Sequence, residues 1–157
     1  NIVLCGMPSS GKTTVGKALA NDFGKRFIDT DDVVVEKKKE SISDIFEKYG
    51  EGEFRKEERL AIEELSKENG LVIATGGGAV LDENNVRALR RNGVILFLDR
   101  SLENLVATAD RPLSSDTEKL KNLFEKRYDV YKSCADAVIP ADGEIADVVE
   151  KIKGVLL

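Results

Sequence analysis

The chain has 157 residues, the usual size of one domain, and its formal net charge of −5 predicts neither nucleic acid nor an anionic membrane as a partner. It contains no histidine, which excludes a histidine general base, a Ser-His-Asp triad and a histidine-ligated metal, and leaves carboxylates, lysines, arginines, hydroxyl groups or a bound cation to do any chemistry. Its two cysteines, Cys5 and Cys134, are too few for a disulfide framework, and free cysteines are typical of the cytoplasm.

Short runs rich in β-formers predict five strands, at Ile2–Cys5, Arg26–Asp29, Leu71–Thr75, Val94–Asp99 and Asp136–Pro140. Three of these runs are almost continuously apolar, as in a parallel sheet that is covered on both faces. Helical patterns separate these strands. Five of them cover 12–22, 51–68, Asp82–Arg91, 117–133 and 143–156, and two more begin at Ser41 and at Ser101. Strands that alternate with helices predict an α/β fold built from right-handed βαβ units.

The segment Gly6–Thr13 matches the phosphate-loop pattern G-x-x-x-x-G-K-[ST] and lies between the first predicted strand and the first predicted helix. In this motif Lys12 reaches the β- and γ-phosphates, and the Thr13 hydroxyl ligates Mg²⁺. A chance match in a glycine-rich turn is the alternative. We expect phosphate contacts from Gly6, Ser9, Ser10, Gly11, Lys12, Thr13 and Thr14. The motif indicates a nucleoside triphosphate but does not say what accepts the phosphate.

Asp29 and Asp31 stand at the end of the second predicted strand. Residues i and i+2 of an extended chain share a face, so both carboxylates are predicted to point toward the carboxyl ends of the strands, where α/β sheets bind ligands. One can hold Mg²⁺, directly or through water, and the other can accept a proton from a substrate hydroxyl. Capping of the next helix by Asp31 or Asp32 is the alternative.

Gly76, Gly77 and Gly78 directly follow the third predicted strand. Three glycines in a row let the backbone approach a ligand closely, although a flexible turn is the alternative. Arg55 has Glu51 and Glu58 at ion-pair spacing on its helix, which a solvated helix face explains equally well.

Two further arginines are candidates for the site. Arg111 precedes Pro112 in a polar loop between helices, which suits a mobile lid. Arg127 shares a helix face with Tyr131, for which surface exposure is the simpler explanation.

Together these segments resemble the shikimate kinase family of P-loop small-molecule kinases, over almost the whole chain. The resemblance is carried by Gly6–Thr13, Asp29-Thr30-Asp31, Gly50–Arg55 with Glu58, Thr75–Gly78, Arg111-Pro112-Leu113, and Arg127 with Tyr131. It implies a three-layer α/β/α fold with five parallel strands in the order 2-3-1-4-5. It also implies one domain over residues 1–157, with a short lid at about 107–117 and substrate-binding helices at about 31–68.

The resemblance implies transfer of the γ-phosphate of ATP to the 3-hydroxyl of shikimate, in aromatic amino acid biosynthesis, by a Mg²⁺-dependent cytoplasmic enzyme that is expected to be a monomer. By similarity Asp31 holds the hydroxyl and acts as base, Asp29 organises Mg²⁺ through water, and Arg111 reaches the transferring phosphate. Arg55 and Arg127 bind the substrate carboxylate and Glu58 orients Arg55. The implied substrate contacts are Asp31, Arg55, Gly76, Gly77, Gly78 and Arg127, and the implied catalytic residues are Asp31, Lys12 and Arg111.

Four positions depart from the family pattern. Ser9 replaces a common glycine, Ala107 and Thr108 stand where an arginine packs on the adenine, and Ser114 replaces a usual leucine. We hypothesise that the adenine is held loosely and that nucleotide selectivity is relaxed. A gluconate or nucleotide kinase and a catalytically silent relative are the alternatives. The pattern Asp29-x-Asp31 with Glu53-Phe54-Arg55 argues against the first, and the retained Lys12 and Asp31 argue against the second.

Overall fold

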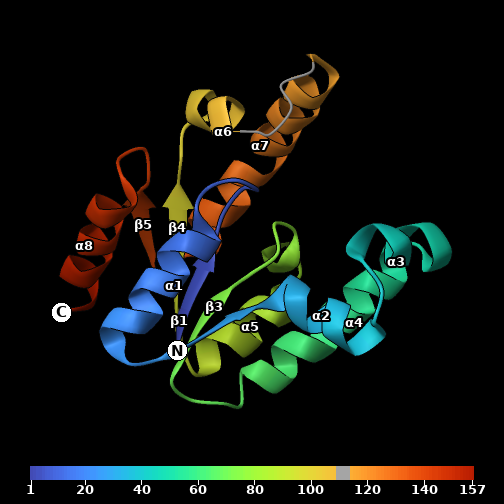
Figure 1. Cartoon of the computed structure of the whole chain (residues 1–157), viewed down its shortest axis with the longest axis horizontal. Helices are drawn as coiled ribbons and strands as arrows, with labels where there is room; N and C mark the ends of the chain where they lie inside the picture. The colour runs from blue at the N-terminus through green and yellow to red at the C-terminus, as the bar shows by residue number, and fades with distance from the viewer. Residues whose placement is uncertain (109–113) are drawn as a thin grey trace.

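A single parallel sheet organises the chain, with its strands in the order β2-β3-β1-β4-β5. It is seen in a computed structural model that describes residues 1–108 and 114–157, apart from the side chains of 108 and 114–116 (Figure 1). The strands are β1 (Ile2–Cys5), β2 (Arg26–Asp29), β3 (Leu71–Ala74), β4 (Val94–Asp99) and β5 (Ala137–Pro140). Both the strand order and the five predicted strands are confirmed, with shifts of one residue at the ends of β3 and β5.

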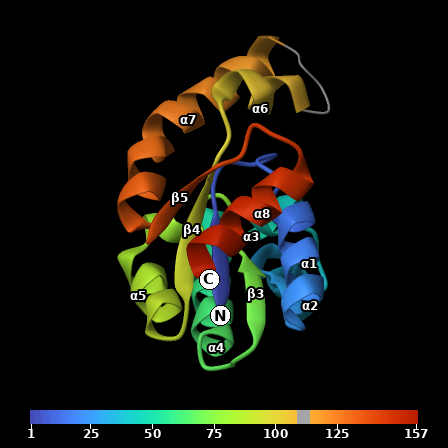
Figure 2. The same ribbon diagram turned by 90° about the vertical axis from the view of Figure 1, so that its left-hand side faces the viewer.

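Helices cover both faces of the sheet, which confirms the three-layer architecture (Figure 2). One face is covered by α1 (Lys12–Phe23) and α8 (Ile145–Leu156), and the other by α4 (Glu51–Leu65), α5 (Glu83–Arg91), α6 (Leu102–Thr108) and α7 (Ser114–Cys134). The strands β1 and β3 are buried along their whole length, as their unbroken apolar runs predict. None of the helices in the described part of the chain combines the length and the apolar character that crossing a bilayer requires.

Beside β2, the helices α2 (Thr30–Lys38), α3 (Ile42–Tyr49) and α4 pack on one another around a small core of their own (Figure 1). Val34, Ile45, Phe54 and Ala61 form that core and are each at most 5% exposed. The predicted caps hold, because the hydroxyls of Ser41 and Ser101 and the carboxylate of Asp82 accept backbone N–H groups in the first turns of α3, α6 and α5. This layer positions α2 and α4 at the carboxyl end of β2.

The structure corrects one prediction at the end of β2. The strand stops at Asp29 and α2 begins at Thr30, so Asp31 lies in the first turn of a helix and not in an extended segment. The helix cap is Asp29, not Asp31 or Asp32: its Oδ1 accepts the backbone N–H groups of Asp31 at 2.8 Å and Asp32 at 3.4 Å. A carboxylate before the first turn satisfies N–H groups that would otherwise have no partner in the helix, and this favours the early start.

A short 3₁₀ helix, η1 (Ala79–Leu81), follows the three glycines and leads into α5. The two cysteines are free and buried, and although they are far apart in sequence a hydrogen bond joins their thiols between the end of β1 and the end of α7. Of the predicted lid at 107–117, residues 109–113, which include Arg111, lie outside the described residues.

Candidate active site

The phosphate loop connects β1 to α1 and is shaped by residues in the left-handed region of backbone space. Gly6 has φ +148° and Gly11 has φ +95°, and a Cβ at Gly6 would lie 2.9 Å from the carbonyl oxygen of Leu98. Ser9, at the position where the family commonly has glycine, also adopts a positive φ of +68°, which costs a side-chain residue about 1–2 kcal/mol. The loop and the start of α1 enclose a hollow of about 350 Å³ lined by 9–14.

Lys12 lies inside this loop and closes it. Its ammonium group donates hydrogen bonds to the carbonyl oxygens of Gly6 and Met7, both at 2.8 Å. Burial lowers the pKa of Lys12 to about 8, while the nearby carboxylates of Asp29 and Asp31 act in the opposite direction. A half-buried cation near two carboxylates at the first turn of α1 is well placed to meet the phosphates of a nucleotide.

Asp31 has a carboxylate that is available for chemistry. Its Oδ1 is buried and has no hydrogen-bond partner among the described residues. Burial raises the pKa of Asp31, and repulsion from Asp29 adds to this, while Lys12 and Arg55 lower it. Asp29 differs because its carboxylate already caps α2. The two aspartates therefore divide their roles: Asp29 holds the backbone, and Asp31 keeps a lone carboxylate oxygen beside two cations.

The three glycines after β3 are where the predicted site residues meet. A Cβ on Gly76 would lie 2.5 Å from Oδ1 of Asp31, and a Cβ on Gly77 would lie 2.9 Å from Nη1 of Arg127. A Cβ on Gly78 would collide with the guanidinium group of Arg55. None of the three glycines has a positive φ, so close packing and not backbone freedom explains this triplet.

Thr30 is a site residue that the sequence reasoning missed. It is fully buried, and its hydroxyl accepts the backbone N–H of Gly76 at 3.0 Å, which ties the start of α2 to the end of β3. This N–H is therefore already bonded, and Gly76 contributes space for the Asp31 carboxylate. The only signal in the sequence is the position of Thr30 between two aspartates, and on its own that signal is weak.

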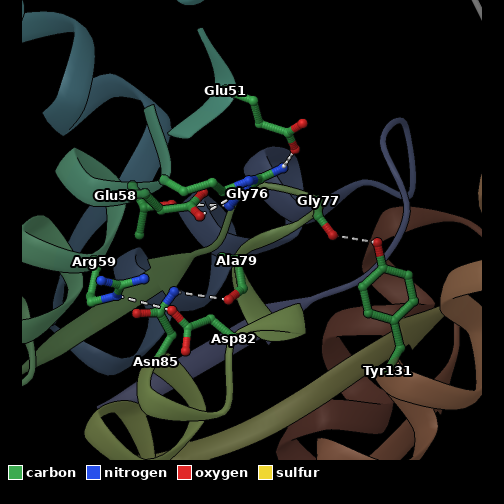
Figure 3. Close-up of polar contacts among 11 residues, drawn as sticks. Glu51, Glu58, Arg59, Gly76, Gly77, Ala79, Asp82, Asn85 and Tyr131 are labelled. Carbon is green, nitrogen blue, oxygen red and sulfur yellow. Dashed lines mark hydrogen bonds and ion pairs between the residues drawn. The ribbon is translucent and has the colours of Figure 1, made fainter. Parts of the chain in front are cut away.

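Arg55 is held on α4 by two glutamates (Figure 3). Its Nη1 lies 2.9 Å from Oε1 of Glu58, whose side chain is only 1% exposed, and its Nη2 lies 3.4 Å from Oε1 of the exposed Glu51. Burial raises the pKa of Glu58, and the Arg55 guanidinium acts against that shift. The pair with Glu51 is the solvated pair that the helix pattern allowed, whereas the pair with Glu58 is a buried contact that aims Arg55 at Gly78.

Tyr131 is fully buried, so the alternative of surface exposure does not hold for this residue. Its hydroxyl donates a hydrogen bond of 2.6 Å to the carbonyl oxygen of Gly77 (Figure 3). Its ring packs on Phe97 at 5.3 Å between centroids. In a trans peptide the C=O and the next N–H point in opposite directions. By holding the carbonyl of Gly77, Tyr131 turns the N–H of Gly78 to the other side, where Arg55 lies.

The structure thus brings together, at the carboxyl edge of β1, β2 and β3, a phosphate loop, one free carboxylate and two arginines. The chemistry that this set supports is transfer of a phosphoryl group to a hydroxyl of a small acceptor that carries a negative charge. No group of three or more metal-ligating side chains occurs within residues 1–108 and 114–157. Mg²⁺ in kinases is held by one or two side chains together with substrate phosphates, so a site of this kind needs no such group. Fold and site together define a P-loop kinase for small molecules.

Comparison with known proteins identifies the family. The family model described as "Shikimate kinase" matches residues 8–156, and the chain belongs to the shikimate kinase family. The shikimate kinase of Clostridium beijerinckii is 39% identical over 99% of this chain and 94% of its own. That of Caldicellulosiruptor saccharolyticus is 44% identical over 85% of this chain and 82% of its own.

Solved structures agree with this assignment. The shikimate kinase from Acinetobacter baumannii in complex with shikimate superposes with a TM-score of 0.93 and 33% identity, over 99% of this chain and 92% of that one. A gluconokinase from Sinorhizobium meliloti aligns with a TM-score of 0.64 at 18% identity over 96% of this chain and 87% of that one, a likeness of fold alone.

Proposed function

We propose that the chain phosphorylates the 3-hydroxyl of shikimate with ATP, giving shikimate 3-phosphate and ADP, on the route to aromatic amino acids. The observation that carries the proposal is the convergence of Asp31, Arg127 and Arg55 on Gly76, Gly77 and Gly78, next to the phosphate loop. This arrangement matches an acceptor molecule that carries a carboxylate and a hydroxyl group. The carboxylate of such a molecule needs cations, and its hydroxyl group needs a proton acceptor. A relative of known structure is a complex with shikimate.

Arg55 and Arg127 are proposed to bind the shikimate carboxylate. Arginine suits this task because its planar guanidinium group can donate two parallel hydrogen bonds to a carboxylate. Glu58 holds the guanidinium group of Arg55 through an ion pair of 2.9 Å. The N–H groups of Gly77 and Gly78 add donors from the backbone, and Tyr131 orients the peptide that joins them.

Asp31 is proposed to act as the base. As the substrate oxygen forms its bond to the γ-phosphorus, the bond from that phosphorus to the bridging oxygen of ADP breaks, and the hydroxyl proton passes to Asp31. Lys12 neutralises charge on the phosphates, with Gly6, Ser9, Ser10, Gly11, Thr13 and Thr14 around them. Arg111 is proposed to reach the transferring phosphate from the lid.

Mg²⁺ is proposed as the cofactor, with Thr13 and Asp29 as its protein ligands, Asp29 acting through water. Hydroxyl and carboxylate oxygens suit this hard cation, and the carboxylate of Asp29 lies near enough to Lys12 of the phosphate loop to raise the pKa of that lysine. When bound, Mg²⁺ supplies charge neutralisation on the phosphates.

Three further proposals concern the domain, the oligomeric state and the cellular compartment. We propose one domain over 1–157, with the lid at about 107–117 and substrate-binding helices at about 31–68. A monomer suffices, because the phosphate loop, the carboxylate and both arginines come from one chain. Two free buried thiols favour the reducing cytoplasm.

A coupled ADP-release assay tests the proposal with shikimate, gluconate and a nucleoside monophosphate as acceptors. Asp31→Asn should lower kcat with shikimate by about 10²–10⁴-fold and leave nucleotide binding intact, because it removes only the proton acceptor. The exposed neighbour Asp32 provides a matched control, and Asp32→Asn should stay within about twofold of wild type, because a surface position of this kind has little effect. Turnover with gluconate or a nucleoside monophosphate but not with shikimate would overturn the proposal.

A further inference from the structure

A second cavity of about 660 Å³ lies between α4 and α5, and none of the residues proposed for catalysis or for shikimate binding lines it. Its volume falls within the range of small-molecule sites. The walls carry Arg59 and Glu63 from α4 and Asn85, Arg87, Arg90 and Arg91 from α5. We call it the α4–α5 groove.

The groove is strongly positive on a protein that is negative overall. Four arginines face one glutamate along its walls, whereas the whole chain has a formal net charge of −5. On α5, Arg87, Arg90 and Arg91 share one helix face, because residues three and four apart are neighbours. Carboxylates beside the groove balance part of this charge, because Arg59, Arg87 and Arg90 each have one within 3.8 Å, and an anion in the groove would balance the rest.

These arginines retain free donors. The side chain of Arg87 is 72% exposed and has one long contact, 3.6 Å to Glu83. Arg90 donates to the carbonyl oxygen of Cys134 at 2.5 Å and has a distant ion pair with Asp136 at 3.8 Å. Arg91 forms no hydrogen bond or ion pair within the described part of the chain.

Asn85 provides an independent indication of a ligand. It is only 2% exposed, and its Nδ2 donates to the carbonyl oxygen of Ala79 at 2.9 Å (Figure 3). Its Oδ1 is buried and has no partner among the described residues. A buried acceptor that stays unbonded is costly, and Asn85 lines the groove, so this oxygen is a candidate acceptor for a ligand there. A ligand hydroxyl supplies the donor.

We propose that the α4–α5 groove is an effector site for a small organic polyanion that carries at least two carboxylates and a hydroxyl group. The carboxylates bind the arginines, and the hydroxyl donates to Oδ1 of Asn85.

The groove is linked to the substrate site through Arg59. Its Nε donates to Oδ2 of Asp82 at 3.0 Å, which ties α4 to the residue that caps α5 and follows η1 (Figure 3). Arg59 lies one turn after Arg55 on α4, and η1 continues directly from Gly78. A carboxylate in the groove competes with Asp82 for Arg59. Its binding therefore disturbs the two segments that position Arg55 and Gly78, and weakens shikimate binding.

Calorimetry on the full chain tests this inference, with ADP present and divalent metal removed. Citrate is the probe, and tricarballylate is its match, since it has the same three carboxylates without the hydroxyl. Citrate should bind at least threefold more tightly than tricarballylate. The double variant Arg87→Gln/Arg91→Gln should weaken citrate at least tenfold, whereas Arg26→Gln, an exposed arginine paired with Glu68 beyond the groove, should stay within twofold.

A second titration measures the affinity for shikimate with and without saturating citrate. In wild type the Kd for shikimate should rise at least threefold, and in the double variant the rise should vanish. A rise that persists in the double variant indicates competition at Arg55 and Arg127 and overturns the inference, as do absent citrate binding, equal affinity for the two probes, or an unchanged Kd. The effect on shikimate rests on the proposed function, but citrate binding is read without turnover, so the two can fail separately.

Discussion

Gly76→Ala is the sharpest test of how the site is built. The new Cβ would lie 2.5 Å from Oδ1 and 3.1 Å from Cγ of Asp31, whereas ordinary contacts begin at 3.4 Å. The nearest carboxylate oxygen therefore has to move by 3.4 − 2.5 = 0.9 Å. A displacement of about 1 Å at a reacting group costs about 10²-fold in rate, so kcat should fall by about that factor.

The same substitution should cost little stability. Gly76 does not have a positive φ, and the Cβ meets only the end of a side chain that can turn away. We expect the free energy of unfolding to change by less than about 1 kcal/mol, below the usual cost of overpacking a rigid core. The coupled assay measures kcat, and thermal or urea unfolding measures stability.

Gly154→Ala is the matched control, because nothing lies within 4 Å of a Cβ at this position in α8. It should leave kcat unchanged and stabilise the chain by up to about 1 kcal/mol, the difference in helix propensity. If Gly76→Ala retains kcat within threefold of wild type, or unfolds the protein, then Gly76 does not act by leaving space for the Asp31 carboxylate.

Four further predictions concern the site. Tyr131→Phe removes the hydrogen bond to Gly77 and should raise the KM for shikimate severalfold, while the KM for ATP stays unchanged. The control is Tyr128→Phe, which removes a hydrogen bond to Asp99 instead. Equal rises in both KM values for Tyr131→Phe would contradict a positioning role. Burial lowers the pKa of Lys12 to about 8, so the affinity for ATP should fall as the pH rises above that value and Lys12 loses its charge. The variant Lys12→Arg keeps its charge and should bind ATP equally at pH 7 and pH 9. Burial raises the pKa of Asp31 above its ordinary value of 3.8, so kcat should fall on acidification at a pH above 3.8, as protonation removes the base. A kcat that holds down to that pH argues against Asp31 as the base. Finally, the KM for GTP should lie within about tenfold of that for ATP, because the usual adenine-packing arginine is replaced near Ala107, and a strong ATP preference would disprove relaxed selectivity.

Much of the fold could be predicted because its signals are local. The strands follow from short apolar runs, and the helix starts at Ser41, Asp82 and Ser101 follow from side chains that cap their own first turn. The strand order came from the family resemblance and not from periodicity, since a crossover leaves no trace in hydrophobic spacing.

The predictions failed where two local signals competed. The apolar end of β2 suggested that the extended chain continues through Asp31, but Asp29 caps a helix at that point. On α7, Leu120, Phe124 and Tyr128 lie at helical spacing before Tyr131 and pack against the same core. That spacing does not show that the Tyr131 ring meets Phe97 or that its hydroxyl meets the carbonyl of Gly77.

By itself, the sequence determined the phosphate loop, the parallel sheet and the absence of histidine, because each depends on residue types or on neighbours within a few positions. Only the tertiary structure decided which charged group meets which glycine, and that Thr30 and Tyr131 hold the turn from segments 46 and 54 residues away. Such contacts arise when α2, α4 and α7 pack around one edge of the sheet. Their geometry depends on that packing, since no spacing along the chain encodes a distance across it.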